Sequence, residues 1–266
     1  MRRGRRRRGV YLLPSLLTIS SLLCGVYAIV AVHNDDYTRA ATAILVALIL
    51  DGLDGAVARL TNTQSDFGVQ LDSLADLVAF GVAPAILSYG WAIKPYTKMG
   101  WLFGTIIPTA LFVSSGAFRL ARFNVQTQTL DKRYFVGLPI PAAAAVIASF
   151  VLFMRDSPSL VLFQHELLSE RVMSALMVII VYALSFLMVS RLRYRSLKGI
   201  EIKKRQPFAL LIGLTLVVLV IASEPSLVAF LFFSLFALSG VIRLIPPIRK
   251  HVAEPIEHLI GGEGGP

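Results

Sequence analysis

The sequence has few of the residues that stabilise soluble or secreted domains. Its single cysteine, Cys24, has no intrachain partner for a disulfide, and only 16% of its 266 residues are charged. The chain is 56% hydrophobic with a mean hydropathy of +0.70, which excludes an ordinary soluble enzyme and a disordered protein. The net charge is +10. In so apolar a chain, this excess predicts contact with anionic membrane lipids and argues against nucleic acid as a partner.

Long apolar runs, in contrast, are abundant. A helix needs roughly 20 apolar residues to cross a bilayer core about 30 Å thick. Eight segments meet or approach this length, so the sequence predicts an all-α, polytopic membrane bundle of about eight transmembrane helices. The predicted spans are Val10–Val32, Ala40–Leu60, Leu71–Ile93, Trp101–Phe123, Gly137–Phe153, Val172–Val189, Phe208–Ser223 and Leu227–Ile245.

The distribution of Lys and Arg predicts how these spans are oriented. With a cytoplasmic N-terminus, 21 of the 26 basic residues fall on the cytoplasmic side and 5 on the other, as the positive-inside rule requires. We therefore expect a multi-pass protein of the plasma membrane with both termini in the cytoplasm. The expected organisation is a basic N-terminus (1–9), a six-helix core (10–190), a basic loop (191–206), two additional helices (207–245) and a cytoplasmic tail (246–266).

Carboxylates are concentrated where spans two and three meet the cytoplasmic boundary. Each costs about 2.5 to 3.5 kcal/mol to insert, so carboxylates at such a place usually mark function. At 100° per residue, Asp51 and Asp54 share one helix stripe, and Asp72 and Asp76 share a face of the next helix. Helices joined by a short link are antiparallel neighbours. The four carboxylates are therefore predicted to converge.

Converging carboxylates require a cation, and hard oxygen ligands favour Mg²⁺ or Mn²⁺, with two ions expected. Gly55, Ala58 and Gly68 have little or no side chain, so a nucleotide or another helix can approach closely. Arg59 offers a bidentate guanidinium to a diphosphate. The pattern predicts metal-assisted phosphoryl transfer at the membrane surface. The alternative interpretations are a polar seam between helices and the cation path of a transporter.

The full motif is Asp51-x2-Asp54-Gly55-x2-Ala58-Arg59-x8-Gly68-x3-Asp72-x3-Asp76, and it resembles the signature of the CDP-alcohol phosphotransferase family at all eight positions. This resemblance covers the first six spans. It implies that the four aspartates surround a divalent metal pair and that Asp76 is the general base that deprotonates the acceptor alcohol. It also implies that Gly55, Ala58, Arg59 and Gly68 line the CDP site, and that the protein is a homodimer.

Three shorter stretches, Phe80–Ala85, Arg119–Asn124 and Gly137–Ala142, resemble the type II phosphatidylserine synthases of this family. The resemblance implies transfer of the phosphatidyl group from CDP-diacylglycerol to L-serine, with release of CMP. Glycerol 3-phosphate, an inositol phosphate and choline are the alternative acceptors. Serine carries a carboxylate, for which Arg119 and Arg122, as i, i+3 neighbours, and Asn124 are candidate ligands. The same residues are candidates for the lipid diphosphate, and the two arginines alternatively anchor the helix to lipid phosphates.

The first span departs in part from the family pattern. It reads Pro14-Ser15-x2-Thr18-x2-Ser21, with serines where related sequences often have asparagines. Thr18 is retained. Its hydroxyl is predicted to hydrogen-bond the cytidine or ribose of CDP-diacylglycerol, or alternatively a backbone carbonyl of its own helix.

Overall fold

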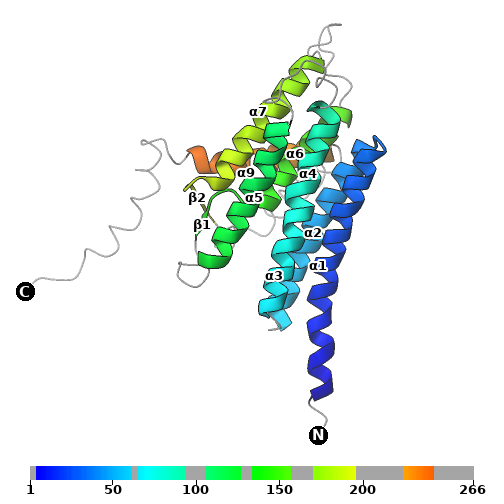
Figure 1. Cartoon of the computed structure of the whole chain (residues 1–266), viewed down its shortest axis with the longest axis vertical. Helices are drawn as coiled ribbons and strands as arrows, with labels where there is room; N and C mark the ends of the chain where they lie inside the picture. The colour runs from blue at the N-terminus through cyan, green and yellow to red at the C-terminus, as the bar shows by residue number, and fades with distance from the viewer. Residues whose placement is uncertain are drawn as a thin grey trace, which may run out of the picture.

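The computed structural model describes residues 4–61, 65–93, 106–126, 134–156, 170–195 and 224–242. Its helices pack side by side into a bundle, and one very short strand pair is the only other regular structure in these ranges (Figure 1). The elements are α1 (Gly4–His33), α2 (Tyr37–Thr61), α3 (Asp66–Asp76), η1 (Leu77–Val82), α4 (Ala83–Ser88), η2 (Tyr89–Ile93), α5 (Ile106–Gln126), β1 (Tyr134–Val136), α6 (Ile140–Asp156), α7 (Glu170–Val189), β2 (Arg193–Arg195) and α9 (Pro225–Ile242).

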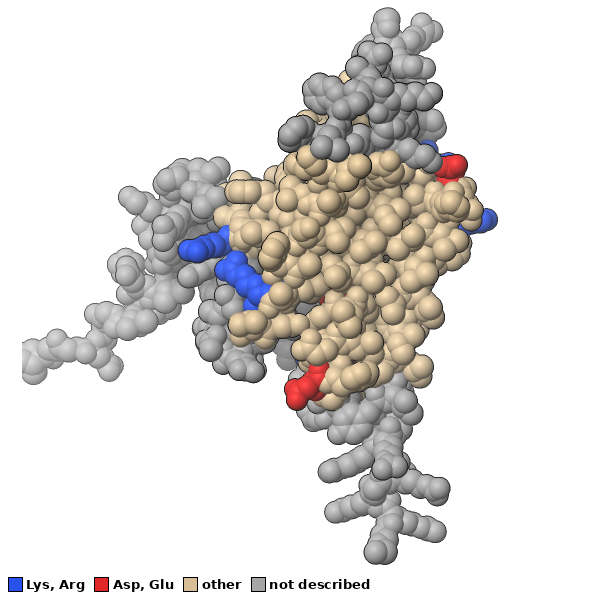
Figure 2. All heavy atoms as spheres, in the orientation of Figure 1, with Lys and Arg blue, Asp and Glu red and all other residues tan. Residues whose placement is uncertain are grey.

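The bundle has the dimensions and surface of a helical membrane protein. Four helical stretches are long and apolar enough to cross a membrane, and α6 and α9 are shorter apolar helices. On the face drawn in Figure 2, the described residues are almost all uncharged, and the acidic and basic side chains lie toward the edges. The four stretches are Pro14–His33, Tyr37–Thr61, Asp66–Ala92 and Val172–Val189. They confirm the predicted fold class but not the predicted number of spans.

The C-terminal part of the prediction is the least supported. The predicted span Phe208–Ser223 lies outside the described residues. Helix α9 packs against α6, and the Phe230 ring lies 5.3 Å from Phe150 and 5.8 Å from Phe153, measured between centroids. Figure 1 shows α9 passing behind the bundle, across the direction of the other helices. A count of eight spans therefore remains a prediction.

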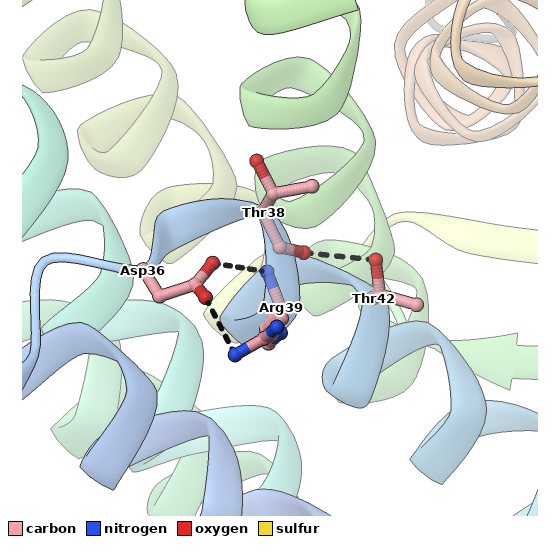
Figure 3. A network of polar contacts seen from close by, with 4 residues as sticks. All are labelled: Asp36, Thr38, Arg39 and Thr42. Atoms are coloured by element: carbon pink, nitrogen blue, oxygen red, sulfur yellow. Dashed lines mark hydrogen bonds and ion pairs between the residues drawn. The ribbon is translucent and has the colours of Figure 1, made fainter.

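A tight turn makes α1 and α2 antiparallel neighbours. Asp35 adopts a φ of +57° there, and Asp36 caps the start of α2 by accepting a hydrogen bond of 3.0 Å from the Arg39 backbone N–H. The same carboxylate lies 3.3 Å from the Arg39 guanidinium (Figure 3). One turn on, the Thr42 hydroxyl donates to the Thr38 carbonyl at 2.8 Å. The turn holds the first two helices together at the end opposite the aspartates.

Small residues bring α1 close to the third span as well. A Cβ atom on Gly25 would lie 2.7 Å from the Ala79 Cα, a distance that real Cβ atoms essentially never show. Glycine and alanine at such a crossing allow the two backbones to approach closely. Helix α1 consequently contacts both helices that carry the predicted aspartates.

The third span is helical as predicted, but it begins earlier and is less regular than the expected Leu71–Ile93. It starts at Asp66, where the Ser65 hydroxyl accepts a hydrogen bond from the Gly68 N–H. Directly after Asp76 the helix widens into the π-helical segment η1, in which the Ala83 N–H bonds to the Val78 carbonyl five residues back. A π-helical segment has more residues per turn, so the residues after it face a different direction than in a continuous α-helix. Such segments are frequent at functional sites.

The predicted span Gly137–Phe153 also needs correction, because α6 begins at Ile140. The preceding residues form β1, which pairs antiparallel with β2, so that Tyr134 faces Arg195 and Val136 faces Arg193. The sequence analysis did not predict this pair. Between β1 and α6, Gly137 has a φ of +82°, and its N–H donates to the Leu192 carbonyl at 2.8 Å. A residue in this conformation cannot start a helix, which explains the later beginning of α6.

Replacing Gly137 by alanine should destabilise the bundle. The new Cβ would clash with the Met188 carbonyl oxygen, and alanine disfavours a positive φ. We expect a loss of about 2 kcal/mol, measured as a lower midpoint of thermal unfolding of the purified protein in detergent. Gly52→Ala is the control, because nothing lies within 4 Å of a Cβ at that position. Equal midpoints for the two variants would contradict this account of Gly137.

Candidate active site at the acidic cluster

Three aspartates from two spans form an acidic cluster, which we define as Asp51 of α2 and Asp72 and Asp76 of α3. One carboxylate oxygen from each lies within 4.8 Å of the other two, and all three residues are half-buried. The carboxyl groups of Asp51 and Asp76 are also within hydrogen-bonding reach of each other. Like-charged groups at this separation repel unless positive charge lies between them.

The acidic cluster fits a divalent cation. Its donor set is entirely carboxylate oxygen, the ligand type that Mg²⁺ and Mn²⁺ prefer. In an octahedron with bonds of about 2.0–2.1 Å, neighbouring ligands lie about 2.9 Å apart and opposite ligands about 4.2 Å, so the three oxygens, which lie within 4.8 Å of one another, would move closer together to bind one ion. The cluster also confirms that the ends of spans two and three face each other, as their spacing in the sequence predicts.

The fourth predicted ligand, Asp54, is placed differently from the other three. Its carboxylate lies outside the group of mutually close oxygens, although it interacts electrostatically with Asp51, Asp72 and Asp76. It is only 6% exposed and accepts a hydrogen bond of 2.7 Å from the Thr18 hydroxyl of α1. The predicted convergence of four carboxylates is therefore observed for three of them. Asp54 lies beside these three and is hydrogen-bonded to Thr18 of α1.

The residues predicted to line a nucleotide site lie near the acidic cluster, toward the end of α2 and the start of α3. Arg59 is exposed and interacts electrostatically with Asp54, and its Nη1 would be 3.3 Å from a Cβ on Gly55. The absence of a side chain at Gly55 thus leaves room for the guanidinium. Ala58 is half-buried, and the Gly68 N–H donates to the Ser65 hydroxyl at 3.1 Å in the first turn of α3.

Helix α5 brings the predicted serine or phosphate ligands to the same region. The Asn124 side-chain amide donates to the Ser73 hydroxyl at 2.9 Å, which ties α5 to α3 next to Asp72. Arg119 interacts electrostatically with Asp76, and its Nε is buried without a hydrogen-bond partner among the described residues. A buried N–H group usually has a partner, so an anionic ligand is a fitting one. Arg122 is half-buried one turn along the helix.

Two contacts at this site were not predicted from the sequence. One is the contact of Ser73 with Asn124. Ser73 follows Asp72 directly in an apolar span, and a hydroxyl at that place could have been predicted to hydrogen-bond a neighbouring helix. The partner of Thr18 was also missed, because no sequence pattern predicts which helix α1 contacts at that level. The Thr18 hydroxyl reaches the Pro14 carbonyl at 3.1 Å as well as Asp54, so the predicted backbone bond is present too.

Comparison with known proteins agrees with this site. The family described as CDP-alcohol phosphatidyltransferase matches residues 11–187. A CDP-diacylglycerol–serine O-phosphatidyltransferase of Helicobacter pylori is 40% identical over 238 residues, covering 89% of this chain and 92% of the relative. An archaetidylserine synthase of Methanothermobacter thermautotrophicus is 35% identical over 189 residues, covering 70% and 71%. The chain therefore belongs to the CDP-alcohol phosphatidyltransferase family.

Proposed function

We propose that this protein transfers the phosphatidyl group of CDP-diacylglycerol to the hydroxyl of L-serine, giving phosphatidylserine and CMP. The observation that carries the proposal is the acidic cluster, because three carboxylate oxygens within 4.8 Å of one another suit a divalent cation and the diphosphate that it binds. The serine acceptor is supported by relatives named CDP-diacylglycerol–serine O-phosphatidyltransferase that align over most of this chain.

Each part of the site has a role in this reaction. Asp51, Asp72 and Asp76 hold the cation, assisted by Asp54, and we propose two Mg²⁺ or Mn²⁺ ions in all. A bound cation polarises the phosphoryl oxygens and offsets the negative charge that develops during the transfer. Arg59 binds the diphosphate, while Gly55, Ala58 and Gly68 leave space for the nucleotide, with Thr18 at the wall of the site.

The transfer itself requires one proton acceptor. Asp76 takes the proton of the serine hydroxyl, whose oxygen then forms a bond to the phosphorus next to the lipid. The bond from that phosphorus to the CMP oxygen breaks, and CMP leaves with the electron pair. Asp76 is suited to this role because it lies in the acidic cluster and also interacts with Arg119 of α5.

Recognition of serine is assigned to α5. The Arg119 guanidinium, whose buried Nε lacks a partner in the described part of the chain, binds the serine carboxylate. Asn124, through its bond to Ser73, keeps this end of α5 beside Asp72 and contributes a polar group to the same region. Arg122 binds the serine carboxylate or the lipid phosphate.

The membrane location, the orientation and the oligomeric state of the protein are also proposals. We propose a plasma-membrane protein with eight spans, cytoplasmic termini and a cytoplasmic active site. The excess of basic residues on one side of the predicted spans supports this orientation. CDP-diacylglycerol then reaches the site from the bilayer and serine from the cytoplasm. The predicted basic loop 191–206, most of which lies outside the described residues, is proposed to contact anionic lipids. A homodimer is proposed from family resemblance alone.

The direct test is CMP release by the purified protein with CDP-diacylglycerol and Mn²⁺, with and without L-serine. We expect CMP release that depends on serine, together with phosphatidylserine identified by mass spectrometry. Glycerol 3-phosphate, an inositol phosphate and choline are tested in parallel. Release with one of these acceptors alone would contradict the serine assignment, and no release with any of them, combined with ion flux in liposomes, would favour a cation transporter.

The roles of the aspartates predict two different kinds of loss. Asp76→Asn removes the proton acceptor as well as one cluster oxygen, so even at saturating Mn²⁺ its turnover should stay about 100- to 10,000-fold below the wild type while binding of CDP-diacylglycerol persists. Asp51→Asn removes a cation ligand, so the affinity for Mn²⁺ should fall about 10- to 100-fold. Steady-state kinetics and Mn²⁺ titrations measure the two effects. An active Asp76→Asn enzyme would rule out Asp76 as the base.

The proposed serine site predicts a selective kinetic change. Arg119→Gln removes a charge-assisted hydrogen bond, which is typically worth about 1.5 to 3 kcal/mol, so the KM for serine should rise roughly 10- to 100-fold. The KM for CDP-diacylglycerol should change much less. A larger change in the KM for the lipid substrate would reassign Arg119 to the diphosphate, and no change in either would leave it as a lipid anchor.

A further inference from the structure

The bond between Thr18 and Asp54 joins the acidic region to a helix outside the aspartate motif. Thr18 lies on α1, and its Oγ1 is 2.7 Å from the Asp54 Oδ2 on α2. Both residues are only 6% exposed, so water competes little for this hydrogen bond. The Thr18 hydroxyl therefore links α1 directly to one of the four aspartates of the motif.

The geometry limits what this hydroxyl can do. A threonine hydroxyl has one proton, and it can be donated to the Asp54 carboxylate at 2.7 Å or to the Pro14 carbonyl at 3.1 Å. The carboxylate is the stronger acceptor and the closer one. A side chain that is 6% exposed and already engaged in this way offers little surface to a nucleotide.

We infer that Thr18 is a positioning residue for Asp54. By donating to Oδ2, the hydroxyl fixes the orientation of the Asp54 carboxylate beside the acidic cluster, where the carboxylate would assist in holding the cation. Residues that orient metal ligands in this way commonly change metal affinity 10- to 100-fold when they are removed. The inference rests on the proposed function, because it assumes that Asp54 assists in binding the cation.

The packing of α1 supports a fixed geometry for this contact. The close approach of Gly25 to Ala79 holds α1 against the third span, one face of which carries Asp72 and Asp76. The Ser21 hydroxyl donates to the Ala47 carbonyl at 3.2 Å and holds α1 against α2. Thr18 thus lies on a helix fixed against both helices that carry the aspartates, which makes its hydroxyl a rigid donor.

The test is a titration of the purified, substrate-free protein in lipid nanodiscs with Mn²⁺, following free Mn²⁺ by electron paramagnetic resonance. Thr18→Val keeps the shape of the side chain and removes the donor, so its Mn²⁺ affinity should fall about 10-fold. Thr18→Ser keeps the donor and should stay within about twofold of the wild type. Thr42→Val is the matched control, because its hydroxyl donates to the Thr38 carbonyl at the end of α2 far from the aspartates.

The outcomes separate this inference from the proposed function. If wild-type protein binds no Mn²⁺, or if Asp51→Asn binds it equally well, the proposed metal site fails. If the wild type binds Mn²⁺ and Thr18→Val binds it with equal affinity, the inference alone is overturned. It is also overturned if Thr18→Ser, with an unfolding midpoint equal to that of the wild type, loses as much affinity as Thr18→Val.

A kinetic measurement distinguishes positioning from nucleotide contact. At saturating Mn²⁺, a positioning role predicts that Thr18→Val restores most of its turnover and keeps a normal KM for CDP-diacylglycerol. A direct contact with cytidine or ribose predicts a raised KM for this substrate at every Mn²⁺ concentration. The second result would overturn the inference in favour of nucleotide binding.

Discussion

The repulsion among carboxylates gathered at one end of an apolar bundle is the constraint on which the rest of the structure depends. Asp51, Asp72 and Asp76 place oxygens within 4.8 Å of one another, in a setting where each charge is costly to bury. Such a cluster persists only where positive charge offsets it and where the surrounding helices prevent the side chains from separating. A divalent cation with a bound diphosphate meets the first condition.

The helices around the cluster meet the second condition. The capped turn at Asp36 holds α1 and α2 together at one end, and the approach of Gly25 to Ala79 fixes α1 against the third span. Helix α5 is tied to α3 by the bond from Asn124 to Ser73. These contacts come from separate segments, and each lies between helices that carry or adjoin an aspartate. The rigidity that the chemistry requires is thus distributed over several helix pairs.

Much of this arrangement was predictable from the sequence, since the spacing places Asp72 and Asp76 on one helix face and a short link allows that face to meet Asp51 on the neighbouring helix. The separate position of Asp54 was not predictable, because it depends on a hydroxyl of α1 that approaches from another direction. The π-helical segment after Asp76 and the pairing of β1 with β2 were also missed. The strand pair joins segments far apart in the chain, and local hydropathy encodes neither that pairing nor the change from an α-helical to a π-helical hydrogen-bond pattern.

The central claim is that a cation held by the acidic cluster meets the diphosphate of the lipid substrate. Pulsed electron–nuclear double resonance on the Mn²⁺-loaded protein with CDP-diacylglycerol tests it most directly, because ³¹P coupling to Mn²⁺ reports a coordinated phosphate. The account predicts strong ³¹P coupling in the wild-type protein and its loss in Asp72→Asn. Bound Mn²⁺ without ³¹P coupling, or coupling that persists unchanged in Asp72→Asn, would contradict it.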